Sequence, residues 1–206
     1  MPHEYTDDDQ RMIRLQEGDS TAFNEIAAEW QGPLFGFFMR NTRRDAELSE
    51  DLIQETLLRV YRAAWDYLPT GTFRGWLFRI ARNLLIDHVR RSSNDVMIRR
   101  VGNRIERNGE EYDPLQSLPA ELASAGDQAE TQEVAQIVNE LLLQLPDDQR
   151  QTFTLHHYDS LTLSEVADAM ETTLPTAKSR LRLAKEKLRY LLTCRGLVEE
   201  TFSESG

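Results

Sequence analysis

The sequence predicts an all-α protein made of two small helical domains joined by an acidic linker. Apolar residues recur at helical spacing through most of the chain, and no segment shows the alternation of a half-buried strand. Of the 206 residues, 40% are hydrophobic, which is enough for compact cores. The predicted domains cover residues 1–92 and 131–195, with the linker at 93–130 and a tail at 196–206.

The first domain is predicted to contain three main helices. Residues 20–40 form one, which the Gly32-Pro33 pair is expected to break or bend. Residues 46–67 form a second, with Asp45 as its N-cap and acids in its first turns, where the helix dipole favours them. Its apolar face is predicted to hold Leu48, Leu52, Val60, Ala64 and Trp65. The third helix runs from about Phe73 to about Arg91.

Charge is distributed unevenly along the chain, whose net charge is -11. Residues 59–107 hold 11 arginines against 4 acids, and residues 172–195 hold 7 basic residues against 1 acid. Between these blocks, residues 109–148 hold 10 acids and no basic residue. Two basic blocks favour two nucleic-acid-facing surfaces, although separate solvated helix faces would give the same pattern.

Several classes of protein are excluded by what the sequence lacks. It has no run of about 18 apolar residues, and its acidic start does not fit a signal peptide, so we expect a cytoplasmic protein without membrane insertion. Cys194 is the only cysteine, and His156 and His157 are adjacent and cannot both face one metal from a helix. No phosphate-binding glycine loop or nucleophile motif is present, so neither an enzyme nor a cofactor is expected.

Residues 161–191 are typical of a helix-turn-helix. Thr162 and Glu165 form a capping box before a short helix, a turn follows at 171–173, and Thr173 can cap the next helix. Pro175 lies in the first turn of that helix, where its missing N–H costs little. The second helix has an apolar face and a separate basic face, which indicates a recognition helix, although a solvated helical hairpin is the alternative. Its apolar face comprises Ala177, Leu181, Ala184, Leu188 and Leu191.

The helix at 73–91 has a second candidate nucleic-acid surface. Phe73, Leu77, Ile80, Leu84 and His88 lie on its core side, while Arg79, Arg82, Asn83 and Arg90 spread over the other. Arginine and asparagine side chains suit phosphates and base edges. Trp76 lies at the margin, where packing in the core is favoured over stacking on an unpaired base.

These motifs together resemble a known family. DAELSEDLIQETLLRVYRAAWDY followed by TFRGWLFRIARNLLIDHVRR looks like region 2 of a bacterial RNA polymerase sigma factor. LPDDQRQTFTLHHYDSLTLSEVADAMETTLPTAKSRLRLAKEKLRYLL looks like region 4, and IRLQEGDSTAFNEI is similar to the first helix of the group. With only two domains and a linker, the chain resembles the small extracytoplasmic-function sigma factors over residues 12–92 and 131–193.

The resemblance implies a role for each surface. The acidic helix would bind the clamp helices of the largest subunit of core RNA polymerase, with Glu47, Glu50, Asp51, Gln54 and Glu55 as candidates. The alternative for these acids is a purely local role at the helix N-terminus. The loop at 69–74 would capture a base flipped from the −10 non-template strand, with neighbouring cations holding phosphates. The −10 candidates are Thr70, Gly71, Thr72, Arg74, Trp76, Arg79, Arg82, Asn83, Arg90 and Arg91.

The second helix of the helix-turn-helix would read the −35 duplex. The family pattern Lys/Arg-Ser-Arg-Leu-x-Arg-Ala-Arg corresponds to residues 178–185, and the −35 candidates are Thr176, Lys178, Ser179, Arg180, Arg182, Leu183 and Lys185. Leu183 departs from the usual basic residue and lies away from the core stripe. One hypothesis is that it contacts a thymine methyl group.

The remaining expectations concern partners and the linker. The family also implies contact with the flap of the second-largest polymerase subunit, and often control by an anti-sigma factor. The acidic linker, with Glu110, Glu111 and Asp113, could occupy a basic polymerase channel as an RNA mimic, or serve only as a tether.

A stand-alone helix-turn-helix regulator is the alternative function. A third class, an adaptor that only binds other proteins, would need neither basic block.

Overall fold

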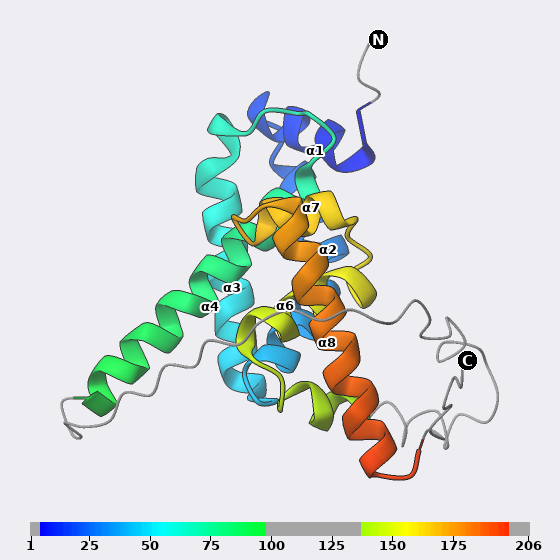
Figure 1. Ribbon diagram of the computed structural model, residues 1–206. Coiled ribbons are helices and arrows are strands. Elements are labelled where there is room, and N and C mark those ends of the chain that lie inside the picture. The colour runs from blue at the N-terminus through cyan, green and yellow to red at the C-terminus, as the bar shows by residue number, and fades with distance from the viewer. Residues whose placement is uncertain (1–4, 98–136, 198–206) are drawn as a thin grey trace, which may run out of the picture.

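The computed structural model describes residues 5–97 and 137–197, and within these ranges every regular element is a helix (Figure 1). The predicted all-α fold is therefore confirmed. The first part contains α1 (Asp7–Gln16), α2 (Ser20–Asn41), α3 (Ala46–Ala63), the 3-10 turn η1 (Ala64–Asp66) and α4 (Phe73–Met97). The second contains a helical stretch at 137–142, then α6 (Asp147–His157), α7 (Leu163–Ala169) and α8 (Leu174–Cys194).

Side-chain caps begin the helices where the sequence predicts them. The Asp45 carboxylate accepts the Leu48 N–H at 3.0 Å at the start of α3. Thr162 and Glu165 form the predicted capping box of α7, and the Thr173 hydroxyl accepts the Thr176 N–H at 3.3 Å at the start of α8. Each such cap satisfies a backbone donor that the helix leaves unpaired, which is worth about 1 kcal/mol.

Helix α2 continues through Pro33, so the Gly32-Pro33 pair does not break it. Gly32 and Pro33 lie on the exposed side, while Trp30 and Leu34 are buried on the other side. A proline inside a helix costs about 3 kcal/mol, and burial of large apolar side chains, each worth roughly 2 kcal/mol, offsets it. Packing on both sides of the proline therefore keeps the helix continuous.

Two further differences concern Trp65 and the end of α4. The Trp65 side chain is 65% exposed rather than part of the apolar face. It follows the exposed Tyr61 by four residues and so lies on the same side of the helix as Tyr61, away from the buried Val60 and Ala64.

Helix α4 runs to Met97, past the expected end near Arg91, since 92–97 contain no glycine or proline to end it.

Helices from both predicted domains pack against one another. One buried cluster joins Trp30, Phe37 and Phe78 of the first part to Val166 and Met170 of the second. Helix α7 lies against the first half of α4, and α6 lies against α2, whereas the second half of α4 runs out past the other helices (Figure 1). A smaller cluster, with Leu141, Leu145 and Leu188 among its members, holds α8 to α6 and the stretch at 137–142.

A buried carboxyl group lies at the α2 contact. Asp159 follows α6 and is 8% exposed, and its Oδ2 has no hydrogen-bond partner in the described part of the chain. The Arg40 guanidinium lies 3.8 Å from the centre of the neighbouring Tyr158 ring. Burial raises the pKa of Asp159 to about 7, against the opposing effect of the Arg40 charge. Asp159 is therefore protonated in the folded protein at pH values where an exposed aspartate is ionised.

This raised pKa predicts a pH dependence of stability. Between pH 4 and pH 7 the folded protein keeps a proton on Asp159 that the unfolded chain releases, so this contribution to stability is lost as pH rises. We expect the free energy of unfolding of the wild type, relative to Asp159→Asn, to fall by about 1 kcal/mol per pH unit at the steepest point. Urea unfolding at several pH values measures this difference, and parallel profiles for the two proteins would contradict it.

Candidate nucleic-acid interface

The loop between η1 and α4 is held in place by α1. The Gln16 side-chain amide donates to the backbone oxygens of Ala64 at 2.7 Å and Tyr67 at 2.8 Å. The Tyr67 hydroxyl donates to the buried Asp9 carboxylate, and burial together with this bond raises the pKa of Tyr67 well above its usual value. Sequence reasoning missed these contacts, because they join residues about 50 positions apart with no local pattern to mark them.

The tip of this loop carries exposed hydroxyl groups on either side of a glycine. Thr70 and Thr72 are exposed, and their hydroxyls lie 2.9 Å apart. Gly71 has a φ of 76°, in the left-handed region that side chains disfavour. Since both hydroxyls are exposed and a glycine separates them, the loop offers hydrogen-bonding groups and close approach to its backbone.

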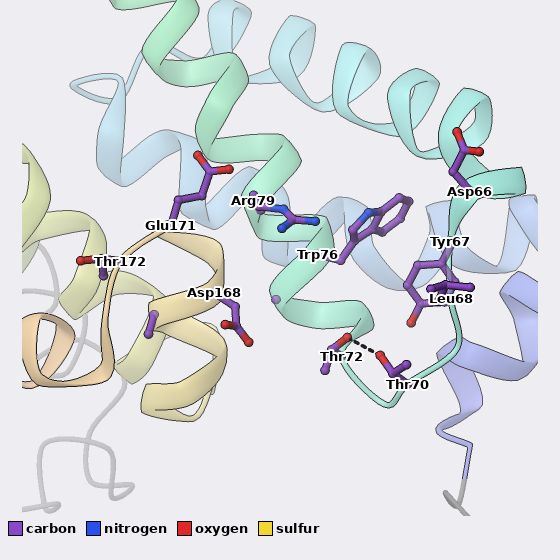
Figure 2. Close-up of a pocket in the computed structure, with 12 residues that line it drawn as sticks. Asp66, Tyr67, Leu68, Thr70, Thr72, Trp76, Arg79, Asp168, Glu171 and Thr172 are labelled. Carbon is purple, nitrogen blue, oxygen red and sulfur yellow. Dashed lines mark hydrogen bonds between the residues drawn. The ribbon is translucent and has the colours of Figure 1, made fainter.

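A pocket of about 500 Å³ with a mixed polar and apolar lining lies beside this loop. Figure 2 shows Thr70, Thr72, Tyr67 and Leu68 on one side and Asp168, Glu171 and Thr172 on the other. Helix α4 supplies Trp76 and Arg79 between these walls. The pocket is thus built from the first part of the chain and from α7 and the turn that follows it.

The structure brings only some of the −10 candidates to this pocket. Arg74 points elsewhere, with its guanidinium 5.5 Å from the centre of the Trp30 ring. Trp76 packs against the core and against the Tyr67 ring at 4.9 Å, which agrees with the core position favoured from sequence, while it also lines the pocket. Farther along α4, Asn83 is half-buried and Arg90 and Arg91 are exposed, the last about 18 Å from Arg79.

Arg82, another −10 candidate, is largely enclosed by protein. Its side chain is 12% exposed, and its Nε donates to Gln151 Oε1 of α6 at 2.9 Å. Its Nη2 lies 3.7 Å from Asp148 Oδ1. Burial lowers the pKa of Arg82, and the Asp148 charge acts in the opposite direction.

On α8, the −35 candidates form a polar surface opposite the buried residues. Lys178 and Ser179 are exposed, and Leu183 is 38% exposed, which confirms that it is not a core residue. Arg182 pairs with Glu186 at 2.8 Å, and Lys185 is half-buried. Thr176 is held by the cap, its hydroxyl 2.8 Å from that of Thr173. Arg180 differs from these residues, because its Nη2 donates to Asp148 Oδ2 at 2.7 Å.

The polymerase-binding candidates lie on the outer side of α3. Glu47, Glu50, Asp51 and Gln54 are exposed, while Glu55 pairs with Arg59 at 3.1 Å. Exposed apolar side chains continue this side of the helix at Leu58, Tyr61 and Trp65. The sequence analysis missed this apolar continuation. Its signal is the spacing of four, three and four residues along Gln54, Leu58, Tyr61 and Trp65, which puts all four on one side of a helix.

Two kinds of site are missing from the described residues. Within 5–97 and 137–197, no His, Cys, Asp and Glu side chains group closely enough to hold a metal ion. No helix in these ranges has the length and apolar character of a membrane span. The linker residues Glu110, Glu111 and Asp113 lie outside the described residues.

Comparison with known families matches both halves of the chain. The family model of Sigma-70 region 2 matches residues 28–94, and that of Sigma-70, region 4, matches residues 135–188. The two matched regions and the fold are thus those of an RNA polymerase sigma factor.

Full-length relatives narrow the assignment. The ECF RNA polymerase sigma factor SigK of Mycobacterium tuberculosis is 32% identical over 194 residues, which cover 93% of this chain and 96% of SigK. The RNA polymerase sigma-H factor of Pseudomonas aeruginosa is 27% identical over 186 residues, covering 88% of this chain and 91% of that protein. The chain therefore belongs to the extracytoplasmic-function sigma factors, which direct promoter-specific transcription initiation. A stand-alone helix-turn-helix regulator is not favoured.

Solved structures share the fold. CnrH in complex with the cytosolic domain of CnrY superposes with a TM-score of 0.64 at 20% identity, over 91% of this chain and 97% of that one. The sigma factor RpoE of Bartonella quintana, in complex with the anti-sigma factor NepR, gives a TM-score of 0.62 at 22% identity, over 83% and 96%.

Proposed function

We propose that this sigma factor reads its promoter through two surfaces, the loop and pocket beside α4 for the −10 element and the exposed side of α8 for the −35 element. The observation that carries this proposal is the helix-turn-helix itself. A capped α7 and a capped α8 present Lys178 and Ser179 to solvent near the start of the second helix. That position is where a recognition helix meets base edges in the major groove.

At the −10 element, the loop chemistry suits a single unstacked base. Removing a base from its stack costs a few kcal/mol, so the site must return hydrogen bonds and aromatic contact. Thr70 and Thr72 offer hydroxyls, and Trp76 offers part of a ring beside them. Arg79, Arg90 and Arg91 follow along α4 and would contact phosphates of the same strand.

Core RNA polymerase is the partner that family membership implies, and we assign its clamp helices to the outer side of α3. The acidic residues Glu47, Glu50 and Asp51 would meet basic groups, and Leu58, Tyr61 and Trp65 would supply apolar contact. Charged groups at a rim with aromatic residues beside them are typical of protein interfaces. The flap of the second-largest subunit would contact the second domain. An anti-sigma factor would regulate the protein, which would act in the cytoplasm.

Run-off transcription with core polymerase tests the function directly. We expect specific transcripts from a promoter library only when the protein is added. No specific transcript with the wild type would overturn the assignment.

Lys178→Ala should weaken binding to the −35 duplex several-fold and reduce by about 1 the slope of log affinity against log salt concentration, because one phosphate or base contact is lost. Lys187→Ala is the matched control, since Lys187 is an exposed lysine about 180° around the same helix.

Leu183 is expected to influence which −35 sequences are preferred. If its side chain contacts a thymine methyl group, Leu183→Arg should change the order of affinities among −35 variants, by roughly tenfold between the extremes. Competition binding against a set of duplexes that vary one base pair at a time measures this order. A uniform change across all duplexes would show that Leu183 contacts no base.

The α3 surface predicts a loss of polymerase affinity without a loss of fold. Asp51→Lys and Trp65→Ala should each weaken binding to core polymerase about tenfold, because the lysine would repel the basic groups of the partner and the alanine would remove an aromatic contact. Tyr190→Ala, which removes a 62% exposed aromatic side chain from α8, is the control. Fluorescence anisotropy of labelled protein measures the affinity. If Asp51→Lys lowers the melting temperature but leaves the affinity unchanged, the acid serves only the helix.

A further inference from the structure

The tip of the loop before α4, residues 68–72, lies between two buried aromatic side chains. Tyr67 is 4% exposed and Phe73 is 1% exposed, and their ring centres are 5.8 Å apart. The Tyr67 ring also packs against the Trp76 ring at 4.9 Å (Figure 2). Between Tyr67 and Phe73, every residue except Pro69 is exposed. The loop therefore combines two fixed ends with an accessible tip.

One side chain of α1 fixes the first end of this loop. Gln16 is the last residue of α1, and its Nε2 donates to the backbone oxygens of Ala64 at 2.7 Å and Tyr67 at 2.8 Å. The Ala64 oxygen also accepts the Tyr67 N–H at 3.1 Å. The two hydrogens of one amide thus hold both ends of the 3-10 turn η1. These bonds set the direction in which the chain leaves that turn.

Asp9 holds Tyr67 from the same helix. The Asp9 side chain is fully buried, and its Oδ2 accepts from the Thr6 N–H at 3.0 Å and from the Thr6 hydroxyl at 2.8 Å. Its Oδ1 accepts from the Tyr67 hydroxyl. One carboxylate therefore joins the N-terminal cap of α1 to the ring at the start of the loop. A buried polar network with its partners in place is rigid, so the Tyr67 ring has a fixed position.

Helix α1 has other contacts that attach it to the rest of the first part. Met12 and Leu15 are buried in the core cluster. The Arg14 guanidinium pairs with Glu25 of α2 at 2.9 Å. These contacts involve neither η1 nor the loop. Loss of the Gln16 amide should therefore leave α1 in place and release only the loop.

We propose that Gln16 and the Asp9–Tyr67 pair are positioning residues of the −10 site, which hold the loop in the conformation that captures an unpaired base. The inference rests on the proposed assignment of this loop to the −10 element. Asp9 is fully buried, and both amide hydrogens of Gln16 are bonded to protein, so these residues act through the loop. A loop that is ordered before binding loses less conformational entropy when the base arrives.

The substitution Gln16→Met removes both donors and keeps the length of the side chain. The probe is a single-stranded −10 oligonucleotide of the non-template strand, from a promoter that run-off transcription selects, bound by the full chain with core polymerase. We expect binding to be about five- to tenfold weaker, and binding to the −35 duplex to be unchanged. Gln10→Met is the matched control, because Gln10 is an exposed glutamine of the same helix. Fluorescence anisotropy measures both affinities.

Base preference distinguishes a positioning role from a purely structural one. A set of oligonucleotides that vary one base at a time gives the preference at each position of the −10 element. With Gln16→Met, the preference at the captured base should fall about threefold, while the preferences at the other positions stay the same. A general loss of fold would instead weaken every oligonucleotide and the −35 duplex by one factor. Circular dichroism melting confirms that the variant is folded.

Tyr67→Phe tests the second contact, because it removes the hydroxyl and keeps the ring. We expect the same pattern with about threefold weaker −10 binding. Tyr5→Phe is the matched control, since it removes a hydroxyl from a 49% exposed tyrosine just before α1. In a double-mutant cycle, Gln16→Met should weaken −10 binding less when Thr70→Ala is present, because the hydroxyl that Gln16 helps to position is then absent.

Thr70→Ala and Thr72→Ala separate failure of this inference from failure of the proposed function. If these variants weaken −10 binding and Gln16→Met does not, the positioning role is wrong. Equal losses with Gln16→Met and Gln10→Met, or equal losses on the −10 and −35 probes, would also overturn it, because a change in the helix alone would explain them. If neither threonine variant changes −10 binding, the assignment of the loop to the −10 element fails.

Discussion

The close packing of α7 on α4 is the constraint on which the rest of the structure depends. Gly75 admits the Glu165 backbone to its surface, and Val166, Ala167 and Met170 are buried there. This contact forms the second wall of the pocket, places α6 beside Arg82, and merges apolar residues from both halves of the chain into one core. A bulky residue at position 75 would disturb all of these features together.

Local charge, rather than net charge, explains how a chain of net charge -11 can bind DNA. The acids are concentrated where DNA is not expected, on the outer side of α3 and in the linker. Those near the candidate DNA-facing surfaces, among them Asp148, Asp168 and Glu171, lie on α6, on α7 and in the turn after it. Asp148 pairs with Arg180 and lies near Arg82, and so offsets part of the positive charge of α8 and α4.

The sequence was sufficient for the features that depend on neighbouring residues. Asp45, Thr162 and Thr173 cap their helices as predicted, and the burial of Ala177, Leu181 and Leu188 follows their helical spacing. It could not predict pairings such as Arg82 with Gln151 or Arg180 with Asp148, which join residues 69 and 32 positions apart. Nothing local marks these partners, because they meet only after helices from distant segments pack. Pro33 shows the same limit, since packing on both sides overrides its local effect.

The position of Asp148 between Arg82 and Arg180 has a consequence for mutagenesis of either arginine. Alanine at position 82 or 180 also removes a cation from Asp148, so the carboxylate keeps one partner instead of two. The change in DNA affinity would then combine a lost contact to DNA with a changed contact between α4, α6 and α8. A double-mutant cycle with Asp148→Asn separates these two contributions.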